Sequence, residues 1–346
     1  MSQNTYCNPK IFIDDEEIKT VSSISYSTSV GTMSSLSVTF SNTNLENKDF
    51  FNKSIEFFLN DGSEDSSPMF RGLVKSSTLA TESISVRAVD IRTLISGNDS
   101  FKVVIDDTKN YDGQTIMQFL IDVIDNEMEN KPSWFSTHAT NDMDKPVFMT
   151  GERGVISPYD KVKELLSKKL DSDDLTDVGE YFFDVFHDGE KSSIIVKKTR
   201  KADINNYDYS LTYYSGIIED NITNRPSPSY AIGESEDGSR VRLDYGNAPQ
   251  GSYGTTITGN FSSRGEAREK MLPFLLSKQD SEKEISLKIS SHYYAELGNI
   301  INIDVPNENL AGQYRITSKN ISFNNDSVDC RLSLNKKPAT IKDYLT

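Results

Sequence analysis

Side chains that could do acid–base or metal chemistry are scattered along this sequence. Its three histidines, His138, His187 and His292, lie far apart, and none neighbours a cysteine or a carboxylate pair at metal-ligand spacing. We interpret them as exposed or locally bonded histidines. The sequence holds no glycine-rich phosphate loop, nucleophile elbow or zinc-binding helix motif. These residues therefore predict no catalytic, cofactor-binding or metal site, and a protein that is not an enzyme.

The densest group of carboxylates is a short run in the middle of the chain, Asp171-Ser172-Asp173-Asp174-Leu175-Thr176-Asp177. A calcium loop places oxygen ligands at positions one, three and five, and glycine at position six. Because Leu175 and Thr176 occupy positions five and six, the run is interpreted as a solvated acidic turn. Paired carboxylates for glycoside hydrolysis meet in space rather than in sequence, and among 52 acids no pair stands out. A hydrolase stays an open alternative.

Tyrosines gather in one segment, as Tyr207, Tyr209, Tyr213 and Tyr214. Tyrosine buries contact area at low entropic cost, so this segment could be a sugar-binding or partner-binding surface. The preferred interpretation is an alternating strand, Tyr209-Leu211-Tyr213, with one face in a core.

The composition bounds the class of protein. With 346 residues, 36% of them hydrophobic, the chain can form two or three packed units. The net charge of −15 disfavours direct nucleic-acid recognition. Residues 101–190 hold 20 acids against 9 bases, which we interpret as a solvated face rather than as a wall that repels DNA. The polar start, Met1 to Lys10, lacks the features of a signal peptide, which predicts synthesis in a cytoplasm, with Cys7 and Cys330 as unrelated reduced thiols.

Hydrophobic periodicity predicts strands at both ends and helices between them. Period-two alternation marks residues 10–100 and 280–336 as antiparallel β-structure. Helical spacing marks 110–126, with Asp112 as its cap, and 158–170, which opens with Ser157-Pro158. A further helical stretch, kinked at Pro273, runs from about Arg264 to Lys278, and Asp188-Gly189 predicts a hairpin.

The two β-rich ends share a plan. In the first, the strand Ser54–Leu59 is followed by an acidic loop and then by Phe70-Arg71-Gly72-Leu73-Val74. In the last, the strand Asn299–Val305 is followed by a loop and then by Gly312-Gln313-Tyr314-Arg315-Ile316. The similarity is one of pattern rather than identity, and chance similarity between two small barrels stays an alternative.

The order of these pieces resembles the hub-protein family of phage tails and contractile injection systems, the tube-to-spike adapters like late control protein D. The resemblance in the first barrel is carried by Ile24-Ser25-Tyr26-Ser27, Leu36–Asn42, Ile55-Glu56-Phe57, the "F-x-G-x-V" strand Phe70–Val74, and Ile84–Asp90, which ends in the family's aspartate. In the second barrel it is carried by Leu297–Ile303 and Ala311–Ile316. Together these stretches cover about half of the chain, and residues 100–260 match only in outline.

The resemblance implies a mainly β fold with an α+β insert. Two similar small antiparallel β-barrels, at 1–105 and, with a preceding helix, 263–346, would flank a middle α+β region at 106–262. It implies a homotrimer whose two barrels per chain form a ring of six β units, so that a six-fold tail tube can sit on a three-fold tip. Expected partners are the tube or distal tail protein, a separate spike or tip protein and the tape measure protein, in the baseplate of a virion. A cell-wall hydrolase and a receptor- or glycan-binding tail module remain the alternatives.

Overall fold

The computed structural model describes residues 8–41, 49–60, 67–96, 101–105, 111–129, 131–137, 154–168, 181–198, 207–212, 217–224, 230–234, 240–244, 254–257, 283–290, 292–306, 310–324 and 327–336. The chain forms two compact units. Unit 1 comprises Met1–Lys168, Tyr181–Thr199 and Ser318–Arg331, and unit 2 comprises Lys169–Glu180, Arg200–Thr317 and Leu332–Thr346. The fold is mainly β with a few helices, which confirms the predicted fold class. The division into three sequence segments stays a prediction.

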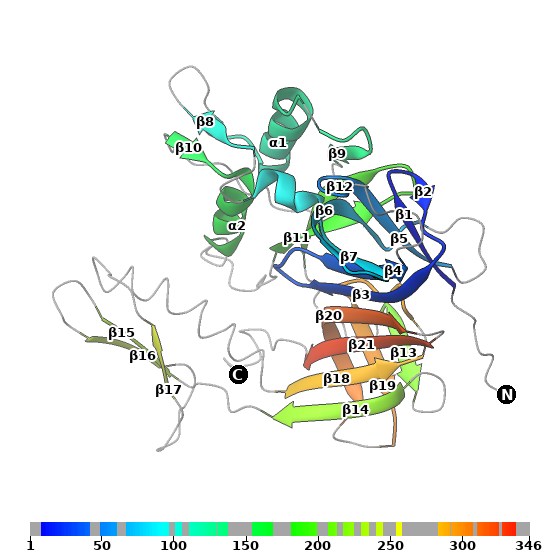
Figure 1. Ribbon diagram of the computed structural model, residues 1–346. Helices are drawn as coiled ribbons and strands as arrows, with labels where there is room; N and C mark the ends of the chain where they lie inside the picture. The colour runs from blue at the N-terminus through cyan, green and yellow to red at the C-terminus, as the bar shows by residue number, and fades with distance from the viewer. Residues whose placement is uncertain are drawn as a thin grey trace. The chain divides into compact units, whose positions relative to one another are not determined.

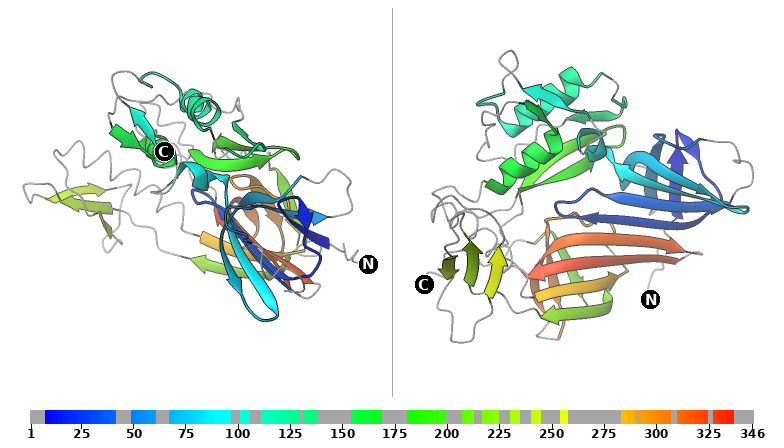
Figure 2. Two further views of the ribbon diagram at one scale, coloured as in Figure 1. Left: turned by 45° about the horizontal axis from the view of Figure 1, so that its top comes forward. Right: turned by 60° about the vertical axis from the view of Figure 1, so that its left-hand side comes forward.

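The first barrel, in unit 1, is a curved antiparallel sheet (Figure 1 and Figure 2). Its strands are β1 (Asn8–Ile13), β2 (Glu16–Glu17), β3 (Val21–Ser29), β4 (Ser35–Ser41), β5 (Ser54–Asn60), β6 (Phe70–Leu79) and β7 (Ser83–Asp90). They lie in the order β3-β4-β7-β6-β5-β1-β2, and residues 318–324 of β20 (Gly312–Asn324) pair with the free side of β3. The predicted alternation is confirmed, because Leu36, Val38 and Phe40 are buried between more exposed neighbours.

Strand β6 departs from this alternation. Every residue from Phe70 to Val74 is buried, which requires cover on both faces of the strand. One face packs into the barrel. The other lies against the α+β insert, since Arg71 contacts the hairpin between β11 (Tyr181–His187) and β12 (Ser192–Lys198). Hydrophobic alternation alone did not predict this second layer.

The insert is a small α+β body with its own core. Its remaining elements are the 3-10 helix η1 (Ile91–Ile95), β8 (Val103–Ile105), α1 (Ile116–Ile121), the π-helix η2 (Asp122–Glu127), β9 (Phe135–Thr137), β10 (Gly154–Ile156) and α2 (Pro158–Lys168). Strand β12 pairs antiparallel with β11 and parallel with β9, and β8 pairs with β10. The fully buried side chains of Phe119, Leu120 and Val162 join one apolar cluster with those of the sheet.

Both predicted helices exist, but the first begins later than expected. Thr115, not Asp112, caps α1: its hydroxyl accepts from the amide of Gln118, and the Gln118 side chain accepts from the amide of Thr115. This reciprocal capping box satisfies two amides at once, so it outcompetes a lone aspartate three residues earlier. In the second helix, the Ser157 hydroxyl accepts from the amide of Asp160, as the Ser-Pro start predicted.

Unit 2 contains the second β region. Its strands are β13 (Tyr209–Thr212), β14 (Ile217–Asn224), β15 (Tyr230–Glu234), β16 (Arg240–Asp244), β17 (Gly254–Ile257), β18 (Lys283–Ile289), β19 (Ile300–Asp304), the first part of β20 and the end of β21 (Ser327–Lys336). The larger sheet has the order β14-β18-β21-β20-β19-β13, and β16-β15-β17 form a small separate sheet. Strand β13 runs parallel to β19, so this sheet is not wholly antiparallel. The predicted helix at 264–278 lies outside the described residues.

The shared plan of the two ends is visible in the strand pairing. Strands β5 and β6 pair antiparallel with Phe57 opposite Phe70, and β19 and β20 pair antiparallel with Ile303 opposite Gly312. Each unit therefore contains one strand–loop–strand hairpin where the sequence pattern placed it. Within the described residues, no helix is long and apolar enough to span a membrane.

Candidate functional site

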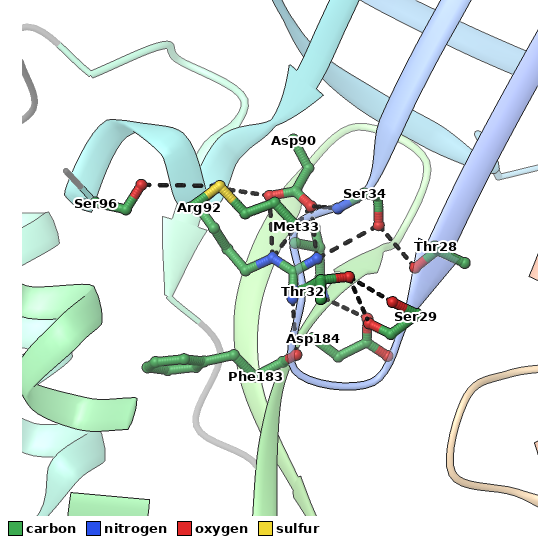
Figure 3. A network of polar contacts seen from close by, with 11 residues as sticks. Thr28, Ser29, Thr32, Met33, Ser34, Asp90, Arg92, Ser96, Phe183 and Asp184 are labelled. Atoms are coloured by element: carbon green, nitrogen blue, oxygen red, sulfur yellow. Dashed lines mark hydrogen bonds and ion pairs between the residues drawn. The ribbon is translucent and has the colours of Figure 1, made fainter. Parts of the chain in front are cut away.

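A buried ion pair lies where the last strand of the first barrel meets the insert (Figure 3). Asp90 ends β7, and Arg92 belongs to the first turn of η1; their side chains are 2% and 1% exposed. The Arg92 Nη2 atom lies 2.6 Å from Asp90 Oδ2, and Nε lies 3.0 Å from Oδ1. Burial alone opposes the charged form, but the neighbouring Asp90 carboxylate raises the pKa of Arg92, so the guanidinium stays charged.

The same pair holds three separate segments together. The Arg92 Nη1 donates to the carbonyl of Phe183 in β11 over 2.8 Å, and Nη2 donates to the Ser34 hydroxyl over 3.4 Å. The Ser34 amide donates to Asp90 Oδ2, and the Ser34 hydroxyl donates to Thr28 over 2.8 Å. Asp90 also accepts from the Arg92 amide over 2.9 Å and so caps η1. Asp90 thus connects the barrel to the insert.

A second arginine makes a matching connection from the outer face of β6. Arg71 forms an ion pair with Glu56 of β5, and its Nη2 donates to the Gly189 carbonyl over 2.6 Å. Its Nη1 donates to the Ser192 hydroxyl over 3.3 Å, and its guanidinium lies 5.6 Å from the centre of the Trp134 ring. Gly189, at φ +84°, provides the turn that the Asp-Gly pair predicted. Both arginines therefore attach the β11–β12 hairpin to the barrel.

His187 is the one predicted histidine that this cluster includes. Its Nδ1 lies 2.7 Å from the Ser192 hydroxyl. Burial, and then the positive charge of Arg71, lower the pKa of His187 to about 4, so the ring is neutral at physiological pH. A serine beside a histidine can form a nucleophile pair. Here the Ser192 side chain is fully buried under Arg71, so no substrate can reach it, and the pair has a structural role.

The other residues singled out from the sequence do not meet at one place. His292, which has a positive φ of 58°, packs edge-on against Tyr209 in unit 2, with ring centres 5.9 Å apart. Leu211 of β13 is fully buried, which fits the strand interpretation of the tyrosine segment. Cys330 is buried in β21, and its burial raises the pKa of the thiol to about 12. His138, Cys7, Asp171–Asp177, Tyr213 and Tyr214 lie outside the described residues. Within the described ranges, no group of three or more histidine, cysteine and acidic side chains could hold a metal ion.

Sequence reasoning missed the arginines, Arg71 and Arg92, that organise this region. One signal was present in the sequence. Arg71 lies within a segment that is predicted to be a barrel strand, and Arg92 follows Asp90 by two positions. A charged residue in an apolar strand predicts a partner, because an unpaired buried charge is too costly. The sequence did not indicate which distant carbonyl and hydroxyl groups would accept hydrogen bonds from these arginines.

Neither a family model nor a curated protein matches the sequence of this chain. Solved structures do match its fold. A tail protein from Neisseria meningitidis MC58 superposes with a TM-score of 0.66 at 10% identity, over 97% of this chain and 98% of that one. The 43 kDa tail protein of prophage MuSo2 from Shewanella oneidensis gives 0.66 at 11% identity, over 96% and 99%.

A third match is an Escherichia coli component of the type VI secretion system, described as similar to the T4 bacteriophage tail proteins gp27 and gp5. It gives a TM-score of 0.55 at 12% identity, over 96% of this chain and 80% of that one. The chain therefore has the fold of tail proteins from phages and related secretion machines.

Proposed function

We propose that this chain is a non-enzymatic structural protein of a phage tail or a related injection machine, and specifically a baseplate hub. Three copies would form a ring that adapts a six-fold tail tube to a three-fold tip or spike. The partners would be the tube or distal tail protein, the spike or tip protein and the tape measure protein, within the virion tail.

The observation that carries this proposal is the agreement of fold along almost the whole chain, combined with one barrel-type hairpin in each unit. Two similar surfaces per chain give six near-equivalent contacts in a closed trimer. The polar groups of the described residues support a structural role, because the charged clusters at Arg92 and Arg71 are buried and saturated by protein partners.

A strand edge of the first barrel also supports assembly with a neighbour. Strand β2 is two residues long and pairs only with Phe12 and Ile13 of β1. On the side of β1 away from β5, the Ile11 carbonyl accepts from the Ile18 amide over 2.8 Å, and among the described residues no strand pairs with Asn8–Lys10. An exposed edge of this kind is an aggregation hazard unless a partner covers it.

The mass of the purified full-length chain in solution tests the proposal. Light scattering should give three times the 38.8 kDa of one chain, and averaged images of an assembled tail should place three copies around a central channel. A ring with six copies of this chain, or a monomer on the tail surface, would contradict it. Hydrolysis of cell-wall glycan by the purified chain would favour the alternative of a tail-associated enzyme.

A further inference from the structure

A pocket of about 620 Å³ opens in unit 1 beside strand β6. Its wall is largely apolar, formed by Leu73, Leu94, Phe101, Met128 and Pro132, and Lys75 stands among these side chains. Its volume lies within the range of pockets that take a small ligand or an anchoring side chain. None of the contacts described for Arg92 or Arg71 involves the side chain of Lys75.

The backbone places Lys75 in this pocket by a specific irregularity. Val74 and Ser76 of β6 face the consecutive residues Ala88 and Arg87 of β7, so Lys75 is the extra residue of a β-bulge. A bulge turns a side chain away from its regular direction, and bulges are frequent beside functional sites. Another lining residue is fixed to the bulged strand: the amide of Asn52, which has a φ of +58°, donates to the Val74 carbonyl over 2.8 Å.

The charge of Lys75 is not neutralised by the part of the chain that the structure describes. No described side chain forms an ion pair or hydrogen bond with its ammonium group, and partial burial lowers its pKa from the ordinary lysine value. Of the two carboxylates in the lining, Glu127 accepts from the Tyr111 hydroxyl, and Glu129 is exposed at the rim. Lys53, by contrast, lies 2.6 Å from Asp14.

We propose that this pocket binds an acidic segment of a partner protein, in which an aspartate or glutamate pairs with Lys75 and an adjacent large apolar side chain fills the apolar part. The ammonium group of Lys75 complements a carboxylate, and the apolar side chains of the lining complement an adjacent apolar side chain. Anchoring residues in small desolvated pockets carry most of the energy of protein contacts. The identity of the partner as another tail protein rests on the proposed function, whereas the chemistry of the segment does not.

Fluorine NMR of capped dipeptides tests the pocket in the full-length protein. The probes are acetyl-Asp-(4-fluoro-Phe)-amide and its Asn counterpart, with unlabelled acetyl-Asp-Ala-amide and 3-phenylpropionate as competitors. The Asp probe should bind at least about fivefold more tightly than the Asn probe. That preference should fall to about onefold in Lys75→Met and remain in Lys75→Arg. The matched control Lys53→Met removes a nearby lysine that already has a partner, and it should leave the preference unchanged.

Each outcome decides the proposal. Equal binding of the Asp and Asn probes, or a preference that survives in Lys75→Met, would overturn it. Competition by acetyl-Asp-Ala-amide as strong as by the aromatic probe would overturn the role of the apolar wall. Tighter binding of 3-phenylpropionate than of the dipeptide would assign the pocket to free small carboxylates instead. The solution mass is independent of these results, so a monomeric chain would contradict the trimeric hub and leave the pocket assignment standing.

Discussion

Removing one partner of the buried Asp90–Arg92 pair should cost far more stability than removing both. In Arg92→Met, the Asp90 carboxylate keeps only the amides of Ser34 and Arg92 itself as partners, and the Phe183 carbonyl loses its donor. In Asp90→Asn, a guanidinium that is 1% exposed keeps only neutral hydrogen-bond partners, with Asp184 as a remaining negative charge that does not hydrogen-bond to it. Breaking a buried pair from either side typically costs about 3–5 kcal/mol. We therefore expect each single variant to lose about that much free energy of unfolding.

The double variant Asp90→Asn/Arg92→Met should be more stable than the sum of the singles predicts. The double variant leaves no buried ion without a counterion, so the coupling energy between the two substitutions should be about 2 kcal/mol or more. Urea unfolding followed by tryptophan fluorescence measures this, because the single tryptophan, Trp134, lies in unit 1. The control is Lys53→Met, which removes the exposed pair with Asp14 and should leave the free energy of unfolding almost unchanged, because solvent screens exposed ion pairs. Additive single losses, or losses below about 1 kcal/mol each, would refute the reasoning.

Other changes probe the same unit by different means. Gly72→Ala should lower the free energy of unfolding by about 1–3 kcal/mol, because a Cβ there would lie 2.2 Å from the Val89 carbonyl oxygen and 2.6 Å from the Phe70 ring. An unchanged melting temperature would contradict this close packing. The pKa of His187 is about 4 in the fold and 6.5 when unperturbed, so its contribution is complete above pH 6.5 and is lost as the pH falls toward 4. The free energy of unfolding should fall by about 1–3 kcal/mol over this pH range, an amount that already allows for the partial exposure of the ring. In His187→Gln, this pH-dependent decrease should be absent from the stability–pH profile. The Cys330 thiol, buried and with its pKa raised to about 12, should react with a maleimide only in denaturant; rapid labelling of the native protein at this residue would show an open β21.

The sequence predicted the elements whose cause is local. Alternation in Leu36–Phe40 gave β4 with the correct buried face, because one side of that strand meets the barrel core. The turn at Asp188-Gly189 and the start of α2 at Ser157-Pro158 were also found, since each depends on the conformational preferences of two residues. The start of α1 was wrong because two capping signals stand three residues apart, and only the reciprocal bonds between Thr115 and Gln118 decide between them.

What the sequence could not give depends on contacts between distant residues. The pairing of β20 with β3 joins segments about 300 positions apart, and no local pattern encodes a partner at that separation. The parallel pairing of β13 with β19 has the same origin. The candidate sites were missed for a related reason: Arg92 and Lys75 are ordinary charged residues in sequence, and only burial and a β-bulge distinguish them.

The two residues that stand out most in the family-like motifs, Gly72 and Asp90, are explained by packing rather than by recognition. They lie opposite each other on β6 and β7. Gly72 allows the Phe70 ring and the Val89 carbonyl to approach the strand, and Asp90 binds the arginine that reaches the insert. Gly72 therefore acts in packing within the barrel, beside the Phe70 ring that contacts Tyr26, whereas Asp90 acts where the barrel meets the insert. Residues that act on partners must instead leave a charge or an edge unsatisfied within the chain, and the described structure has these features at Lys75 and along the outer edge of β1. Surface variants at those two places should therefore alter assembly while leaving the unfolding transition unchanged, whereas variants at Gly72 and Asp90 should alter both.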